Sequence, residues 1–533
     1  MLINIMAAKC IGIEAVPVTV EVDITSGIGV HLVGLADVAV KESLLRTITA
    51  LQSLGFHIPG KKIVINLAPA DLHKNGGGYD LPIALGIIAA SGQRELPGLE
   101  KYILMGELGL DGSLREIQGS LPIADLASSL HKKGCVFPLE SALEATECSG
   151  LDIFGVSCLQ DVLRILEEKE DPSDLLIWNS SISRSRSGSG HGVRSSIVSD
   201  AMDFSEIIGQ ESAKRGAEIA AAGGHNLIMV GPPGSGKSSL AKALAGILPP
   251  MTKEESIVTS KIYSVYGVNK SGIGLIHERP FRAPHYSASL PAIVGGGAGQ
   301  DIRPGEVTLA HNGILFIDEY GQMPKSVLEA LRGPMEDRKV TISRLRSKLE
   351  YPASFMLVAA SNPCPCGYFG EGERCTCTPG QRAAYLSRLS GPVMDRLDLQ
   401  VLMHPVDPSK LIDGIKEEPS KAIAERVAKA REIQRERFKD IGIFCNSEMS
   451  SREMEVFCHL DDACKDVLGK IMKRSGLSAR AFSRIIRIAR TIADLEAVSL
   501  EVATRPDPGP ILPRHLLEAA SYRFLDRANI FEI

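Results

Sequence analysis

The sequence is poor in aromatic residues, which make up 5% of its 533 residues and include a single tryptophan. It also lacks any apolar run of the roughly 18 to 20 residues that a membrane span requires; the longest apolar stretches lie around 81–90 and 227–230. No basic segment followed by an apolar core and a cleavage site opens the chain, so we expect no signal peptide. These absences predict a cytoplasmic protein without a membrane segment.

The chain also lacks a strong excess of either charge. Its net charge of −5 excludes non-specific binding of polyanions by the whole surface, so any contact with nucleic acid requires a local basic patch. The hydrophobic content of 44% and the charged content of 23% exclude disordered and fibrous classes. Eleven cysteines form no regular disulfide framework, and in a reducing compartment such residues are buried thiols, metal ligands or nucleophiles.

The length exceeds what one hydrophobic core can serve and suggests about three domains. Residues 1–170 alternate β-branched strands with short helices, which predicts a mixed α+β domain. Residues 171–203 include a stretch rich in Ser, Gly and Arg at 180–196, typical of a flexible linker. Residues 204–407 alternate apolar strands with helices, which favours an α/β fold with a parallel sheet. Residues 408–533 are helical in pattern and predict a helical lid.

The most specific motif follows the apolar strand at 227–230 and opens a helix. It fits G-x-x-x-x-G-K-[ST], a phosphate loop whose backbone N–H groups surround a β-phosphate at a helix N-terminus. We expect Lys237 to pair with the β- and γ-phosphates of ATP and the Ser238 hydroxyl to ligate Mg²⁺. The residues predicted to bind nucleotide are Gly231, Pro232, Pro233, Gly234, Ser235, Gly236, Lys237 and Ser238.

An acidic pair ends a second buried strand. The residues Ile314–Ile317 lead into Asp318 and Glu319, and the carboxyl end of a parallel strand places such a pair beside the phosphate loop. We expect Asp318 to hold Mg²⁺ and Glu319 to orient the attacking water, because phosphoryl transfer depends mainly on positioning and charge stabilisation. The alternative is a strand end with two solvated carboxylates.

With these parts in order, residues from about 200 to 525 resemble the magnesium-chelatase-like AAA+ ATPases, in their YifB/ComM branch. The segments that carry the resemblance are GPPGSGKSSLAKAL, FRAPHYSASLPAIVGGG, RPGEVTLAHNGILFIDE, LRGPMEDRKVTISR, ASNPCPCG, SGPVMDRLDL and LSARAFSRIIRIARTIADLE.

The resemblance implies roles for three further residues. Asn362 would be the sensor-1 residue that helps to place the lytic water. Arg396 is similar to an arginine finger, which acts on the ATP of the neighbouring subunit and is typically worth about 10³ to 10⁵ in rate. Arg480 resembles the sensor-2 arginine of the lid. Each arginine could instead be a plain surface cation, and a finger acting between subunits implies a homo-oligomer, most commonly a hexameric ring.

Residues 1–170 resemble the Lon-protease-like (S5-like) domain that precedes the ATPase in this family, as in GYDLPIALGIIAASG and GELGLDGSLREI. Peptidases of this type use a serine activated by a lysine. Gly78 stands where the serine is expected, and the segment REIQGSLPIA contains no lysine. The departure indicates a non-proteolytic scaffold or partner-binding domain.

Two further patterns concern a metal and DNA. Four thiols in a C-x-C-x₈-C-x-C arrangement could form a tetrahedral structural Zn²⁺ site or remain unmetallated or redox-active thiols; they are Cys364, Cys366, Cys375 and Cys377. Four arginines recur along one face of the helix after Ala479 and could meet nucleic-acid phosphates, or face ATP, a neighbour or solvent; they are Arg480, Arg484, Arg487 and Arg490.

The function that the resemblance implies is a hexameric DNA branch-migration motor of the ComM type, acting in recombination and natural transformation. The alternative is a protein-remodelling ATPase or a regulator with a protein partner at the N-terminal domain. Chelatase-type insertion of Mg²⁺ into a porphyrin is a third hypothesis, which the N-terminal domain argues against because it is not part of that machine.

Overall fold

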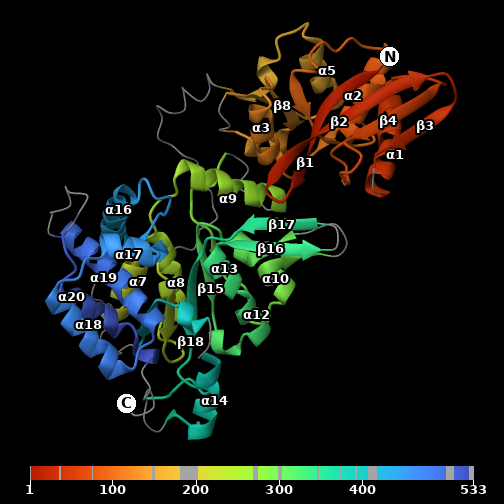
Figure 1. Cartoon of the computed structure of the whole chain (residues 1–533). Coiled ribbons are helices and arrows are strands. Elements are labelled where there is room, and N and C mark those ends of the chain that lie inside the picture. Colours follow the sequence, from red (N-terminus) through yellow and green to blue (C-terminus); the bar gives the residue numbers. More distant parts are fainter. Residues whose placement is uncertain are drawn as a thin grey trace. The chain divides into compact units, whose positions relative to one another are not determined.

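The computed structural model describes residues 2–34, 38–74, 76–146, 150–179, 202–267, 274–297, 303–344, 347–370, 374–389, 393–405, 417–499 and 509–526. Two compact units make up the chain (Figure 1). The first unit combines residues 1–196 with 253–277, and the second combines 197–252 with 278–533. None of the described helices is both long and apolar enough to cross a membrane.

Two four-stranded sheets form the framework of the first unit. Strand order is β1-β2-β4-β3 in one and β10-β9-β8-β5 in the other, and β6 pairs with β7 as a short ribbon. The strands are β1 (Ile3–Ile11), β2 (Glu14–Thr25), β3 (Gly29–Val33), β4 (Lys62–Ala68), β5 (Tyr102–Leu104), β6 (Glu107–Leu108), β7 (Leu114–Arg115), β8 (Gly134–Pro138), β9 (Asp152–Val156) and β10 (Leu176–Trp178). Along β4 fully and partly buried residues alternate, as in a sheet with one face on a core.

Five helices among the described residues 38–179 pack on these sheets and share one hydrophobic core with them. They are α1 (Val38–Ser53), α2 (Asp80–Ala90), α3 (Ser120–Ser129), α4 (Leu139–Glu144) and α5 (Leu159–Glu167). Nine residues of α2 are buried, because its sequence DLPIALGIIAA carries apolar side chains all round. The mixed α and β content agrees with the prediction for this part of the chain.

One helix of the first unit comes from much later in the sequence. The chain leaves the second unit after Thr252, forms α9 (Lys253–Tyr266) within the first unit, and re-enters the second unit at Glu278. The Lys261 amine contacts Asp125 at 2.8 Å, and the Ser264 hydroxyl donates to Glu144 at 2.9 Å. The sequence prediction had instead placed this segment in the core at 204–407.

A five-stranded sheet forms the centre of the second unit, in the order β12-β15-β18-β11-β19. All neighbouring pairs are parallel, as the alternation of strands and helices predicted. The strands are β11 (Leu227–Val230), β12 (Phe281–Arg282), β15 (Ile314–Ile317), β18 (Met356–Ser361) and β19 (Leu399–Leu402). Every residue of β11, β15 and β18 is buried, since helices cover both faces of a parallel sheet.

The remaining elements of this α/β part are short helices and two-stranded ribbons. The helices are α7 (Glu211–Gly223), α8 (Lys237–Gly246), α10 (Leu290–Val294), α11 (Glu306–Leu309), α12 (Lys325–Ala330), α13 (Arg332–Asp337) and α14 (Pro379–Leu389). The ribbons are β13 (Gly295–Gly296) with β14 (Arg303–Pro304), and β16 (Lys339–Arg344) with β17 (Ser347–Pro352).

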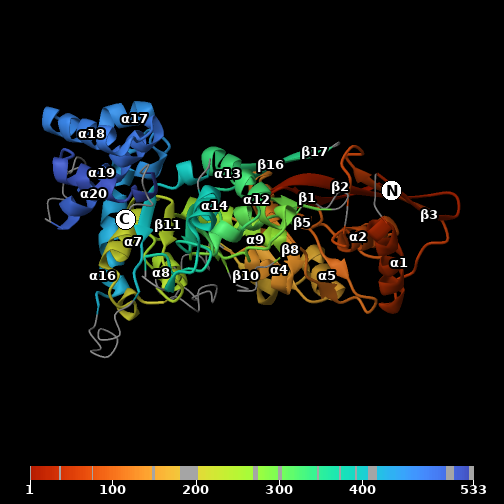
Figure 2. The same cartoon turned by 90° about the horizontal axis from the view of Figure 1, so that it is seen from below.

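Helices make up the last part of the second unit, and both views show them gathered beside α7 (Figure 2). They are α16 (Ser420–Arg437), α17 (Ser451–Phe457), α18 (Asp462–Ser475), α19 (Ala479–Ser499) and α20 (Pro513–Ser521). Their apolar side chains belong to the same core as those of β11, α7 and α8. The helical character agrees with the predicted lid, although the shared core joins it to the sheet.

Part of the predicted linker at 171–203 can be compared with the structure. Trp178 is 6% exposed in strand β10, which pairs with β9, so the folded first unit extends beyond residue 170. The stretch rich in Ser, Gly and Arg at 180–196 lies outside the described residues.

Candidate nucleotide site

Three neighbouring strands end at the same edge of the central sheet. Val230 of β11 lies opposite Ser361 of β18, and β18 in turn pairs with β15, which ends at Ile317. The backbone N–H of Gly231 donates to the Ser361 carbonyl at 3.1 Å. The phosphate loop, Asn362 and Asp318 therefore emerge side by side, at the edge where open α/β sheets bind ligands.

The phosphate loop runs from β11 into α8, as predicted. Gly236, the N-cap of α8, has φ 89° and ψ 17°, a left-handed conformation that side chains with a Cβ disfavour. The first N–H groups of a helix have no partner within it, and the helix dipole makes this end attractive to anions. The loop thus leads into a helix N-terminus of the kind that favours a bound anion.

The Lys237 side chain lies across this loop. Its Nζ donates to the carbonyls of Gly231 at 2.7 Å and Pro232 at 2.8 Å, and to Oδ1 of Asn362 at 3.2 Å. Burial lowers the pKa of the amine, and the nearby Asp318 carboxylate opposes that change. The structure therefore brings the predicted phosphate-binding lysine and the predicted sensor-1 residue into direct contact.

The two predicted magnesium ligands also meet. The Ser238 hydroxyl donates to Oδ2 of Asp318 at 2.9 Å, and Oδ1 of the same carboxylate accepts the N–H of Glu319 at 2.9 Å. A hydroxyl and a carboxylate are oxygen ligands of the kind that Mg²⁺ uses. Glu319 has φ 50°, a left-handed backbone that costs about 1 to 3 kcal/mol outside glycine and concentrates at functional sites.

The predicted arginine finger pairs with a residue of its own chain. The Arg396 side chain is 8% exposed and forms an ion pair with Glu336 at the end of α13. The predicted sensor-2 residue, Arg480, is 63% exposed and pairs with Asp395 at 3.2 Å. Asp395 adjoins Arg396 in a 3₁₀ turn, so both arginines lie around the segment that leads into β19.

The basic stripe predicted on α19 is mostly inside the protein. Arg490 is 3% exposed and pairs with Asp494, and Arg484 is 12% exposed and pairs with Asp398 at 3.1 Å. Burial raises the pKa of Asp398, but His225 and the charges of Arg484 and Arg487 outweigh it and hold the pKa at about 2. Arg484 and Arg490 therefore match neither the predicted DNA contact nor the alternatives of ATP, a neighbour or solvent, because they form ion pairs inside the protein.

The four clustered cysteines converge. Their sulfur atoms all lie within 4.8 Å of one another. Separations are 3.3 Å between Cys364 and Cys366, 3.9 Å between Cys364 and Cys375, and 3.7 Å between Cys366 and Cys375. A disulfide would bring two sulfurs to about 2.0 Å, whereas four thiolates around a tetrahedral ion, each about 2.3 Å from it, lie about 3.8 Å apart. The geometry thus fits a four-thiolate metal site.

Gly78 of the first unit stands where the resemblance implies a peptidase serine. A Cβ built on Gly78 would lie 2.9 Å from Cε of Met105, the flexible end of that side chain. A Cβ on the adjacent Gly77 would lie 2.6 Å from Oε2 of Glu107 and 2.8 Å from Nη2 of Arg46.

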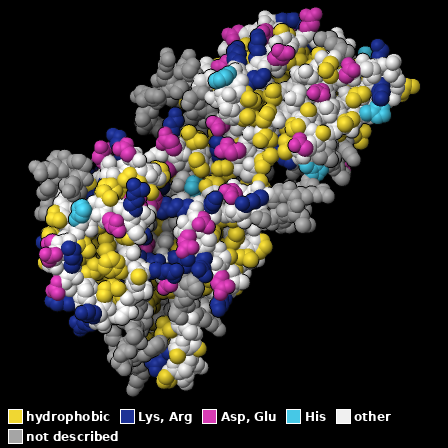
Figure 3. All heavy atoms as spheres, viewed as in Figure 1, with side chains coloured by type: hydrophobic (Ala, Val, Ile, Leu, Met, Phe, Trp, Pro, Cys, Tyr) yellow, Lys and Arg dark blue, Asp and Glu magenta, His cyan; other side chains and the backbone are white. Residues whose placement is uncertain are grey.

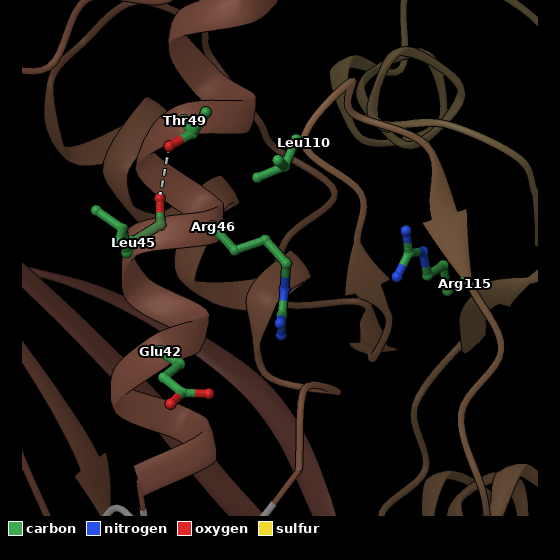
Figure 4. A pocket seen from close by; sticks show the side chains of 6 residues that line it. All are labelled: Glu42, Leu45, Arg46, Thr49, Leu110 and Arg115. Carbon is green, nitrogen blue, oxygen red and sulfur yellow. Dashed lines mark hydrogen bonds between the residues drawn. The ribbon is translucent and has the colours of Figure 1, made fainter.

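A shallow hollow lies beside α1 in the same region (Figure 4). Its only described hydroxyl, on Thr49, donates to the Leu45 carbonyl at 2.9 Å, and its described lining includes no lysine or histidine base. The hollow therefore lacks an activated nucleophile. The residues that line it are Glu42, Leu45, Arg46, Thr49, Leu110 and Arg115.

Sequence reasoning missed three residues that contact the nucleotide site. Glu336 holds Arg396, Tyr385 bonds to Ser361 at 3.1 Å, and Gly367 packs on Pro233. Two of them gave a signal, since Glu336 and Gly367 stand in the segments LRGPMEDRKVTISR and ASNPCPCG that carry the family resemblance.

Comparisons with known proteins agree with this arrangement. The chain matches the family "Magnesium chelatase, subunit ChlI" at residues 203–411, "Subunit ChlI of Mg-chelatase" at 20–141, and "Magnesium chelatase, subunit ChlI C-terminal" at 417–523. It is 41% identical to YifB of Salmonella typhimurium, over 98% of this chain and 96% of that protein. It is 40% identical to the competence protein ComM of Haemophilus influenzae, over 97% and 96%. A shorter match, 26% identical over 188 residues, is to Lon protease 2 of Bacillus subtilis, over 30% and 33%.

Proposed function

Because the chain belongs to the magnesium-chelatase-like family that includes YifB and ComM, we propose that it is an AAA+ motor that hydrolyses ATP and acts on DNA. The observation that carries the ATPase proposal is the meeting of Lys237, Ser238, Asp318 and Asn362 at three adjacent strand ends.

Each of these residues has a role in the proposed reaction. The loop N–H groups and Lys237 bind the phosphates, and Ser238 with Asp318 holds the Mg²⁺ that supplies charge neutralisation when bound. Glu319 orients the attacking water, and Asn362 holds that water in line with the γ-phosphate. Because these groups are fixed by strands and a helix before nucleotide arrives, little reorganisation is needed during the reaction.

The ring is the second part of the proposal. Arg396 acts as the finger on the ATP of a neighbouring subunit, in a homo-oligomer of six chains, and Arg480 contacts the phosphates from the lid. For Arg396 this requires that its ion pair with Glu336 opens when subunits assemble.

DNA as substrate is supported by the relative named as a competence protein and by exposed cations on the ATPase unit. Lys339 and Lys348 of the ribbon β16–β17 are 52% and 68% exposed and share the single carboxylate of Glu350. Figure 3 shows Lys and Arg side chains, with acidic ones among them, over β16, β17 and α13. The positively charged side chains of this ribbon can contact DNA phosphates, and such contacts make the binding affinity depend on the salt concentration.

A protein substrate is the second candidate, favoured by the match to a Lon protease and by the packing of Met105 against Gly78. In this proposal the N-terminal domain, which has Gly78 where the resemblance implies a serine, binds a polypeptide without cleaving it.

Rates of ATP hydrolysis separate the two candidates. We expect single-stranded, duplex or four-way-junction DNA to stimulate the full-length protein at low salt, and Lys237→Ala to remove the stimulated rate. Lys242→Ala is the matched control, because the Lys242 side chain is exposed on the same helix. Stimulation by unfolded polypeptide alone, without DNA binding or junction unwinding, would refute the DNA proposal in favour of the second candidate.

For the four cysteines we propose a structural Zn²⁺ site, since zinc is the usual occupant of tetrahedral four-thiolate sites. Purified protein should contain zinc in a 1:1 ratio to the chain, about one ion each, and Cys364→Ser/Cys366→Ser should lose it. Protein without bound metal after purification under reducing conditions would refute the site.

A further inference from the structure

The cysteine-rich loop is built into the nucleotide site. We define the cysteine knuckle as residues 363–370 with 374–378, and its four thiols are those described above. Three contacts join it to parts of the site that bind or act on nucleotide, and all three lie within the second unit.

The first connection is the short stretch of backbone between Asn362 and Cys364. Cys364 is fully buried and stands two residues after Asn362, whose side chain accepts a hydrogen bond from Lys237 at 3.2 Å. An ion that fixes the Cys364 sulfur also restricts the backbone that carries Asn362, because only Pro363 separates the two residues.

The second contact is with the phosphate loop. Gly367 has φ 88°, and a Cβ built on it would lie 2.7 Å from Cδ of Pro233. The knuckle backbone therefore packs directly on the loop, in a conformation that favours glycine. Gly367 lies between the two cysteine pairs in sequence, so proposed metal ligands precede it and follow it.

The third contact runs through α14, which begins at Pro379, two residues after Cys377. Tyr385 of this helix bonds to the Ser361 hydroxyl at 3.1 Å, and a Cβ on Gly321 would lie 2.8 Å from its phenolic oxygen. Ser361 precedes Asn362, and Gly321 follows Glu319 by two residues. Helix α14 thus spans from the sensor-1 strand to the turn after the acidic pair.

Among the described residues, two cation–π contacts also stabilise the knuckle. Its own aromatic side chains stack under arginines, Arg374 over Tyr368 at 4.6 Å and Arg382 over Phe369 at 4.7 Å. Such contacts contribute about 0.5 to 1 kcal/mol at exposed sites, whereas a four-thiolate zinc site in a small motif contributes on the order of 10 kcal/mol. The ion would therefore dominate the order of this segment.

We propose that the cysteine knuckle is a positioning device for ATP hydrolysis: with zinc bound, it holds Asn362 and Pro233 in place, so that metal occupancy sets the rate of the hydrolytic step. The proposal rests on the proposed ATPase function and on the proposed zinc site. The cysteines themselves touch no substrate and act through Asn362.

The test uses the full-length protein and three variants. Cys377→Ser removes a ligand that lies farthest along the chain from Asn362, Cys377→His supplies an alternative zinc ligand, and Cys158→Ser in the first unit is the matched control. Metal content is measured by elemental analysis, and Co²⁺ substitution gives an absorption spectrum that reports thiolate ligation. Hydrogen exchange of peptides covering 356–370 and 227–240, nucleotide affinity and ATP turnover are measured on the same samples.

We expect Cys377→Ser to lose the metal, to exchange faster in both peptides and to lower kcat by about tenfold or more, with nucleotide affinity changed less than about threefold. The affinity is spared because α8 and β11 still carry the loop, whereas a displaced Asn362 weakens transition-state stabilisation. Cys377→His and Cys158→Ser should keep metal, exchange and kcat near those of the parent.

Three results would overturn the proposal. These are metal-free parent protein, Cys377→Ser with no metal but unchanged exchange in both peptides, and Cys377→Ser with no metal but unchanged kcat. If the parent protein hydrolyses no ATP, the proposed function fails, whereas the metal content and the exchange measurements still decide whether the ion holds Asn362 in place.

Discussion

The partly buried carboxyl of Glu144 should make the stability of the first unit depend on pH. Glu144 lies at the end of α4 and accepts hydrogen bonds from Ser120 at 3.0 Å and from Ser264 of α9 at 2.9 Å. Burial raises its pKa from 4.5 to about 7, against the two hydroxyl donors and with a further small contribution from the charge of Glu116. The folded state therefore holds a proton that the unfolded chain releases between pH 4.5 and 7.

The magnitude follows from the shift. A raised pKa means that the carboxyl stabilises the fold fully below pH 4.5 and that this stabilisation is lost as the pH rises to about 7. At about 1.4 kcal/mol per pKa unit, the loss is roughly 3 kcal/mol. Glu144→Gln copies the protonated carboxyl and accepts the same two hydroxyl bonds. It should be more stable than the parent by about this amount at pH 8 and nearly equal to it at pH 4.5.

The single tryptophan allows this to be measured in the full-length protein. Trp178 is 6% exposed in β10, so its fluorescence during urea unfolding reports on the first unit alone. The variant Glu140→Gln, at an exposed position of the same helix, is the control and should follow the parent at every pH. Parallel urea midpoints for the parent and Glu144→Gln from pH 5 to 8 would refute the assignment of a partly buried, protonated carboxyl.

Three further predictions concern the second unit. Ser238→Ala should raise the Mg²⁺ concentration needed for half-maximal ATP turnover, measured by metal titration; an unchanged titration would exclude this hydroxyl as a ligand. Arg437→Met removes one of the two arginines that pair with the buried Asp494 and should lower stability by about 1.5 to 3 kcal/mol in thermal unfolding followed by circular dichroism. Lys439→Met, at a side chain that is 69% exposed, should change it by less than about 1 kcal/mol. Mixing Arg396→Ala with Lys237→Ala should restore hydrolysis at roughly a quarter of the sites if subunits form a ring with head-to-tail interfaces; two variants that stay inactive in mixed oligomers would contradict a finger supplied by the neighbour.

The parts of the site that are local in sequence were predictable. The motif from Gly231 to Ser238 fixes a strand, a loop and a helix in order, because glycine, lysine and a hydroxyl at that spacing suit a phosphate and little else. Asp318 and Asn362 were predicted at strand ends, and the parallel sheet brings both to the phosphate loop. The structure gives their placement, while their roles stay predictions.

The parts that depend on distant partners were not predictable. The spacing of Arg484, Arg487 and Arg490 gives one helix face, but periodicity cannot tell a solvated basic face from one that meets buried carboxylates such as Asp398. Arg396 pairs with Glu336, 60 residues earlier, and no local pattern links them.

The insertion of α9 into the first unit was missed for the same reason. Its helical pattern was visible, yet its partners Asp125 and Glu144 lie more than 100 residues away in sequence. A single sequence gives the helix but not the unit that it joins, because contacts of this range leave no periodic signal.

The most direct test of the account is ATP binding and hydrolysis by Lys237→Ala beside Lys242→Ala. Lys237 lies against Gly231, Pro232 and Asn362, whereas Lys242 is exposed one turn further along α8. The account predicts that Mg²⁺-dependent phosphate release is abolished in Lys237→Ala and retained in Lys242→Ala. Equal phosphate release by the two variants would contradict a nucleotide site at the phosphate loop.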